Sequence, residues 1–323
     1  MTDPKLVEEA AAPAAVPGAE ALPPDAPVEG APMRSQGRDV WRQFRSHRGA
    51  MLALVIFAAI VLFVSLGPVL WRIDPTFVDY RARNQGFTLA HPFGTDQLGR
   101  DLLARMMAGG QVSIAVGLVA MAIALSLGSL VGVLSGYFRR LDAPLMRLTE
   151  LFLALPLLPL LLLMVTLFRE PLGKALGPAG GTFLLIVCAI GATSWMQTAR
   201  IVRGDVLGLK EREFILAAKS IGTPAPRMIL RHVLPNVVSP IMVAATLGIA
   251  TAIITESALS FLGLGFPPDF PTWGRLLFDA VDQMQMYPWR VILPGAFISL
   301  TVLSVNYIGD GLRDAMDPRI RGR

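Results

Sequence analysis

Apolar residues in this chain gather into long uninterrupted stretches rather than alternating with polar ones. Six such stretches cover residues 50–71, 112–136, 151–168, 182–199, 237–256 and 291–308. Each is near the ~20 residues that an α-helix needs to cross the hydrocarbon core of a bilayer. The pattern therefore predicts an all-α polytopic membrane protein with six transmembrane helices.

The composition agrees with this prediction. Mean hydropathy over the 323 residues is +0.55, and only 16% of them are charged, against about a quarter in soluble domains. The net charge is +5, but the basic residues flank the apolar stretches and form no stripe with interleaved aromatic residues, which argues against nucleic acid as a partner. A single cysteine, Cys188, excludes an intrachain disulfide, and we expect it to be a small buried hydrophobe.

Charge and composition also divide the chain. Residues 1–33 are acidic and rich in Ala and Pro, which predicts a disordered tail. We expect the first transmembrane helix and an outside loop in 34–110, the core transmembrane domain in 111–310, and a second tail in 311–323. With an N-terminus inside, 20 of the 29 Lys and Arg residues lie in inside segments and 9 in outside loops. The positive-inside rule therefore predicts that both termini are cytoplasmic.

Small and breaking residues refine the picture of the predicted helices. Glycines repeat every four residues in the second stretch, at 128, 132 and 136, so another backbone can approach that side closely. Pro156 and Pro159 interrupt the third stretch and predict a bend there.

The first outside loop carries a mixed pattern of charge and apolar residues. Residues 94–110 place Leu102 and Met106 on one helical side and Arg100 and Arg105 elsewhere. This pattern predicts a separate amphipathic helix lying against the membrane part.

Motifs for catalysis are missing from the sequence. "PLGKALG" at 171–177 lacks the spacing of a nucleotide-binding P-loop, no G-x-S-x-G occurs, and His47, His91 and His232 are isolated. The sequence therefore predicts no catalytic residue, no metal site and no cofactor bound by this chain. Glu256 lies at the outer end of the fifth stretch, and the mid-span positions carry no carboxylate. An autonomous proton-coupled carrier usually needs one there.

Residues 201–236 form a basic insert between two apolar stretches. Residues 205–220 contain good helix formers, and Gly222 follows them as a C-terminal glycine cap. We expect Thr223 to cap a second short helix with Pro224 at its first position, and Pro235 to end it. Because so short a helix is marginal in water, we expect a partner's groove to hold it.

Here the residues resemble a known family. Ala217-Ala218, then Gly222, then Leu234-Pro235 is similar to the "EAA" loop of permease subunits of ATP-binding cassette (ABC) importers. Further segments look like the C-type subunit of dipeptide and oligopeptide permeases: "HPFGTDQLGRDLLARMMAGGQVSIAVGL" (91–118), "ESALSFLGLGFPP" (256–268), "PTWGRLL" (271–277) and "GDGLRDAMDPR" (309–319). The chain departs from the family at Leu216, where many members have glutamate, and at His232, where isoleucine is usual.

The resemblance implies a type I ABC importer permease fold in the cytoplasmic membrane of a prokaryote. It also implies a heterodimer with a B-type permease, two cytoplasmic ABC ATPase subunits that carry ATP and Mg²⁺, and a periplasmic or lipid-anchored binding protein. The chain itself is then a transporter subunit for di- or oligopeptides and not an enzyme. A nickel or nickel-chelate importer permease is the alternative within the family, and a proton-coupled secondary transporter is the alternative outside it.

The resemblance assigns roles to three groups of residues. The loop would dock on an ATPase through Leu216, Ala217, Ala218, Gly222, Thr223, Pro224, Arg227, Arg231, Leu234 and Pro235. Glu256, Ser257 and Trp273 are candidates for the outer gate. By analogy, Met164, Thr246 and Thr251 would line the translocation path.

Overall fold

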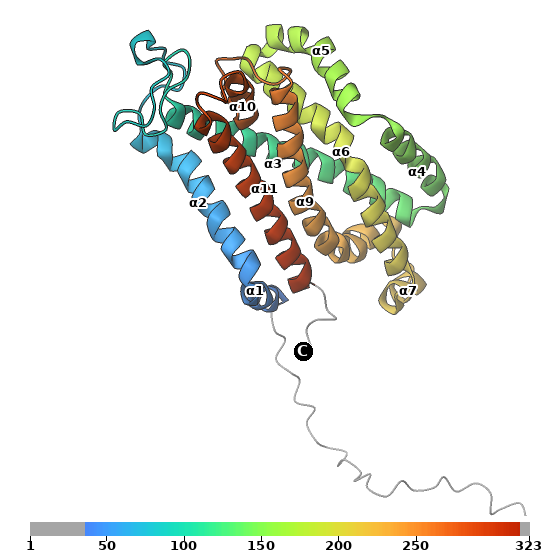
Figure 1. The fold of residues 1–323 in the computed structure, drawn as a ribbon. Helices are drawn as coiled ribbons and strands as arrows, with labels where there is room; N and C mark the ends of the chain where they lie inside the picture. Colours follow the sequence, from blue (N-terminus) through green and yellow to red (C-terminus); the bar gives the residue numbers. More distant parts are fainter. Residues whose placement is uncertain (1–35, 317–323) are drawn as a thin grey trace, which may run out of the picture.

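A computed structural model describes residues 36–316, which form a bundle of tilted helices (Figure 1). The long straight helices are α2 (Arg48–Leu70), α3 (Leu102–Tyr137), α6 (Pro178–Lys210), α9 (Leu234–Phe261) and α11 (Trp289–Met316). These five are long and apolar enough to cross a membrane. They confirm five of the six predicted spans, with longer bounds. The predicted tail 1–33 lies outside the described residues.

The third predicted span has a different shape. Helices α4 (Arg139–Ala154) and α5 (Leu157–Leu176) meet at 85°, so the predicted third stretch, 151–168, starts in α4 and continues in α5 beyond a sharp break. The predicted bend is confirmed, because Pro156 lies in the break and cannot donate a backbone hydrogen bond. Counted as one crossing, this pair brings the described chain to six spans.

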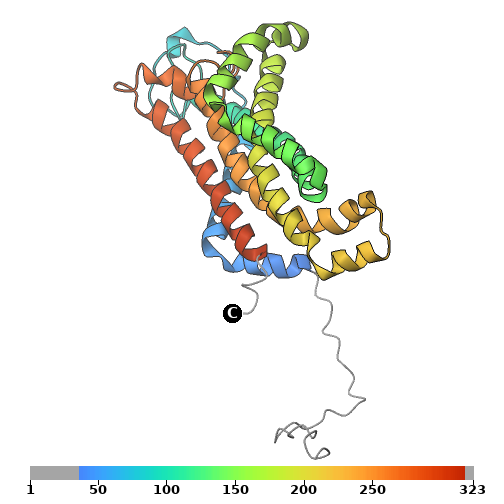
Figure 2. The same ribbon diagram turned by 90° about the vertical axis from the view of Figure 1, so that its right-hand side faces the viewer.

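Short elements gather at the two ends of the bundle (Figure 2). One end, called here the hairpin end, carries α1 (Gln36–Ser46), α7 (Glu213–Ser220) and α8 (Ala225–Met228), and α11 finishes there too. The opposite end, called the loop end, carries residues 71–101, with a 3₁₀ turn at Tyr80–Ala82, and α10 (Trp273–Val281).

Helices α3 and α6 pack along each other through the predicted glycine seam. A Cβ on Gly128 would lie 2.6 Å from the carbonyl oxygen of Trp195, and one on Gly132 would lie 2.7 Å from that of Ala199. Both distances are closer than real carbon contacts, so only glycine permits this approach. The predicted close packing at 128, 132 and 136 is confirmed.

The predicted amphipathic helix over 94–110 is wrong. Residues 94–101 form a turn closed by an isolated β-bridge between Thr95 and Asp101. Helix α3 starts at Leu102, where the carboxylate of Asp101 accepts a hydrogen bond from the Ala104 N–H at 2.7 Å. Leu102 is buried as expected, but so are Arg100 and Arg105. The pattern misled because its charged side chains pair with other buried charges instead of facing water.

The expectation for the single cysteine is also wrong, because Cys188 is exposed. Its helix, α6, buries Val187 and Ile190 in the central apolar cluster, and a different face carries the exposed Leu184 and Cys188. An apolar stretch in a membrane helix has one face toward the core and another toward lipid or a partner, and hydropathy alone does not separate the two.

Candidate functional site

The hairpin of α7 and α8 turns at Gly222, as the sequence predicts. Gly222 has φ of +78°, a left-handed conformation that costs a residue with a side chain. Its N–H donates to the carbonyl of Lys219 at 3.0 Å, and the N–H of Thr223 donates to the carbonyl of Ala218 at 3.2 Å. These two bonds form a Schellman motif, which ends α7 and satisfies its last carbonyl groups.

The second arm of the hairpin differs from its prediction. Pro224 occupies the N-cap of α8 and no side chain caps it, so the expected Thr223 cap is wrong. Nor does Pro235 end the helix: α8 continues through a π-helical turn, Ile229–Val233, into α9. There the N–H of Leu234 donates to the carbonyl of Ile229. This shift in register lets the helix accommodate the missing donor of Pro235.

The hairpin is held by its own chain. Eight buried side chains from α3, α6, α7, the second arm and α9 form one apolar cluster: Val133, Val202, Val206, Ile215, Ala218, Met228, Val233 and Val237. At its edge, Lys210 Nζ donates to the carbonyls of Gly136 and Tyr137, at 3.2 and 3.1 Å. The membrane bundle therefore anchors one face of this short helix, and the expected partner groove over its other face stays a prediction.

The outward side of the hairpin remains uncovered. Phe214, Leu216, Ile221 and Leu230 are exposed, Ile221 at 84%. Of the ten predicted docking residues, Ala218 is buried and Thr223 and Leu234 are half-buried. The others are exposed: Leu216, Ala217, Gly222, Pro224, Arg227, Arg231 and Pro235.

At the loop end, the candidate gate residues lie in one buried polar cluster. Glu256 is fully buried in α9 and accepts hydrogen bonds from Ser113 Oγ at 3.0 Å and Ser260 Oγ at 2.7 Å. Ser113 in turn accepts the backbone N–H of Trp273 at 3.2 Å. Ser257 is buried beside them. The carboxylate thus connects α3, α9 and the start of α10.

A second cluster at the loop end was not predicted from the sequence. Arg105 Nη2 pairs with Asp279 Oδ2 at 3.3 Å, Arg275 Nε pairs with Asp279 Oδ1 at 3.0 Å, and Arg100 Nε pairs with Asp96 Oδ2 at 2.6 Å. Burial raises the pKa of Asp279, and the charges of its arginine neighbours oppose that rise. The pairs fix residues 94–101 and α10 on the start of α3.

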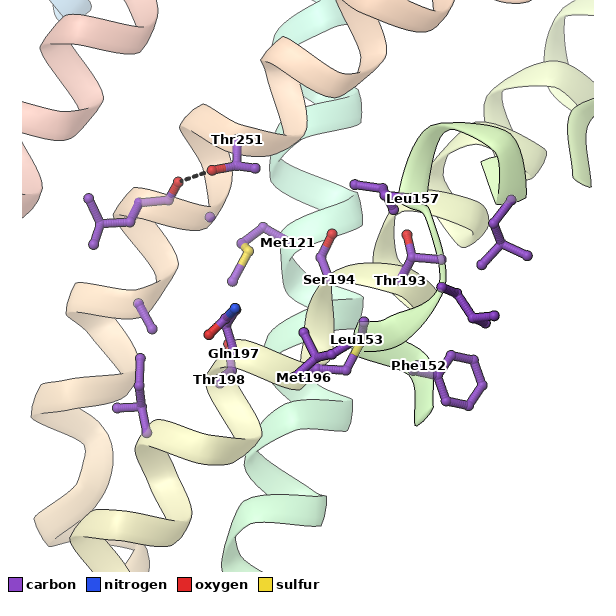
Figure 3. Close-up of a pocket in the computed structure, with 16 residues that line it drawn as sticks. Met121, Phe152, Leu153, Leu157, Thr193, Ser194, Met196, Gln197, Thr198 and Thr251 are labelled. Atoms are coloured by element: carbon purple, nitrogen blue, oxygen red, sulfur yellow. Dashed lines mark hydrogen bonds between the residues drawn. The ribbon is translucent and has the colours of Figure 1, made fainter. Parts of the chain in front are cut away.

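A cavity of about 420 Å³ opens at the break between α4 and α5, facing the middle of α6 and α9 (Figure 3). Its lining, drawn from residues 36–316, contains no charged side chain. Apolar groups dominate it. The polar lining residues are Thr193, Ser194, Gln197, Thr198 and Thr251.

The cavity includes one of the three expected path residues. Thr251 lines it, with its hydroxyl donating to the carbonyl of Leu247 at 3.0 Å (dashed in Figure 3). Met164 packs instead against the central apolar cluster, and Thr246 lies against α11, where a Cβ on Gly309 would strike its hydroxyl. The sequence pattern did not single out Gln197 or Ser194, because isolated uncharged polar residues leave a membrane-length apolar stretch recognisable as one.

Groups of three or more His, Cys, Asp or Glu that could hold a metal ion do not occur within the described residues.

Comparisons with known families, solved structures and curated relatives agree with one another. Residues 124–322 match the family described as "Binding-protein-dependent transport system inner membrane component", and residues 35–89 match "N-terminal TM domain of oligopeptide transport permease C". A methionine ABC transporter structure, titled as inward facing, superposes with a TM-score of 0.54 at 18% identity, over 67% of this chain and 97% of that one. At that identity the likeness concerns the fold.

Curated relatives align over nearly the whole chain. The oligopeptide transport system permease protein OppC of Haemophilus influenzae is 39% identical, covering 90% of this chain and 92% of its own. The dipeptide transport system permease protein DppC of Alkalihalophilus pseudofirmus is 37% identical, covering 89% and 91%. Both family matches and these relatives lead to one conclusion: the chain belongs to the inner-membrane permease components of binding-protein-dependent ABC transport systems.

Proposed function

We propose that this chain is the C-type permease subunit of an importer that moves di- or oligopeptides across the cytoplasmic membrane. The peptide substrate is supported by the names of relatives that align over about nine tenths of the chain. In this proposal a B-type permease completes the path, and a periplasmic or lipid-anchored binding protein delivers the peptide. Two separate ATPase subunits bind ATP and Mg²⁺.

One observation carries the coupling part of the proposal: the hairpin is anchored on the inside and uncovered on the outside. Its buried face belongs to the same apolar cluster as α3, α6 and α9. Its outer face exposes Ile221 and Leu230. Exposed apolar side chains on a structured element are typical of a protein contact. ATPase closure would therefore move the hairpin together with the helices that line the cavity.

The orientation follows from this assignment. An ATPase that uses cellular ATP binds on the cytoplasmic side, so the hairpin end faces the cytoplasm and the loop end faces the binding protein. The excess of Lys and Arg in the hairpin-end segments supports this orientation.

A purification and uptake experiment tests the proposal. The tagged chain, extracted in mild detergent, should bring a second permease and ATPase subunits with it, and reconstituted vesicles should take up peptide only with ATP. If the chain is recovered alone, and uptake stops with the proton gradient but survives ATP depletion, the proposal is wrong and a proton-coupled carrier is favoured.

A further inference from the structure

Gln197 is unusual among the polar residues that line the cavity. The hydroxyls of Thr193 and Thr251 already donate to backbone carbonyls of their own helices, at 2.8 and 3.0 Å. The amide of Gln197 has no hydrogen-bond partner within residues 36–316, and the side chain is exposed. Figure 3 shows it beside Met121, in the space between α9 and the α4–α5 break.

The chemistry of this position suits one kind of group. A carboxamide offers N–H donors and a carbonyl acceptor, which is the complement of a peptide bond. The lining carries no charge, so the cavity provides no counter-ion for a charged side chain of the cargo. Its volume of about 420 Å³ lies within the range of small-ligand sites, ~300–1,000 Å³, which are mainly apolar with a few placed polar groups.

Resting on the proposed function, we propose that Gln197 is a specificity-determining residue that binds the backbone amide of the passing peptide. The N–H and C=O of one residue of an extended peptide point to the same side and pair with the carboxamide, while the cargo's side chains lie against the apolar lining. Gln197 thereby recognises what all peptides share and leaves side-chain selection to the binding protein.

The test uses the complete transporter in vesicles, with its binding protein and ATPases. Uptake of trialanine is compared with uptake of trialanine N-methylated at its peptide bonds, which removes the donors. Discrimination by the binding protein is common to all variants and cancels between them. We expect the preference for unmethylated peptide to fall by roughly three- to tenfold in Gln197→Leu, the size of one lost hydrogen bond. Thr255→Val is the matched control and should keep the wild-type preference, because Thr255 lies outside the cavity lining and its hydroxyl is bonded to the carbonyl of Thr251.

The outcomes separate this inference from the function on which it rests. If wild-type vesicles import neither peptide with ATP, the proposed function fails. If wild type imports trialanine and Gln197→Leu keeps the full preference, the Gln197 role is overturned while the function stands. If Gln197→Leu does not transport at all, Gln197→Asn is measured in its place. Its shorter side chain should reduce the preference for unmethylated trialanine. An unchanged preference there, with less co-purified second permease, would assign Gln197 to the subunit interface instead.

Discussion

At the loop end of the bundle, the buried Arg105 pairs with the half-buried Asp279, whereas at the hairpin end the charges of α7 face outward beside exposed apolar side chains. The loop end joins α3 and α10 through ion pairs and through Glu256. At the hairpin end, the hairpin of α7 and α8 rests on one apolar cluster of eight buried side chains. We infer that contacts within the chain fix the loop end, whereas the outward side of the hairpin is left available for a partner.

The largest expected effect comes from breaking the buried charges. Arg105→Ala removes a fully buried cation from this network and leaves Asp279 to Arg275 and Arg100, with Asp96 left to Arg100. Removing one member of a buried pair costs up to about 3–5 kcal/mol. Thermal unfolding of the purified transporter should show a large loss of stability. The control is Lys174→Ala, which breaks an exposed pair with Glu170. Equal shifts for the two variants would contradict the distinction between buried and exposed pairs.

The next effect tests whether the hairpin is anchored by its own chain. Met228 is 1% exposed within the cluster beneath the hairpin, so Met228→Ala should cost about 2–5 kcal/mol through the cavity it leaves. Hydrogen exchange should speed up in α7 and α8 while the loop end keeps its protection. Leu230→Ala, two residues along and exposed, should change local stability by less than about 0.5 kcal/mol. If both variants leave exchange unchanged, a partner rather than the bundle holds the hairpin.

A smaller effect is expected at the turn itself. Gly222→Ala meets no atom within 4 Å but forces a side chain into φ of +78°, which costs roughly 1–2 kcal/mol. Gly208 in α6 also has open space but no positive φ, so Gly208→Ala should be stabilising by up to about 1 kcal/mol. If backbone conformation is the cause, denaturation should show a lower free energy of unfolding for Gly222→Ala and a higher one for Gly208→Ala. Changes of the same sign in both variants would exclude this cause.

The smallest effect on stability is expected on the uncovered face. Ile221→Ser should leave unfolding unchanged, because the side chain is 84% exposed. Binding to the ATPase subunits should instead weaken by roughly tenfold or more, the free energy of burying an aliphatic side chain. Leu216→Glu should bind nearly as well as wild type, since glutamate is common there in the resembled family. Unaltered ATPase binding in Ile221→Ser would remove that residue from the interface.

Some features of the fold follow from the sequence because their causes are local. The membrane-spanning segments could be predicted because each requires only a run of apolar residues long enough to cross the bilayer. The break at Pro156 and the turn at Gly222 depend on the backbone chemistry of single residues and their nearest neighbours. Pro235 shows the limit of this reasoning, since a π-helical turn beside it keeps the helix continuous.

The sequence by itself determined the number of membrane-crossing segments, the glycine seam and the position of the hairpin, because hydropathy and backbone preference act over a few residues. Only the tertiary structure decided that Arg105 pairs with Asp279, 174 positions away, and that Gln197 faces a cavity. The position of a charge or an amide in the sequence does not show which distant residue it will contact. Whether it meets water, a counter-ion or an open cavity depends on which helices pack against it.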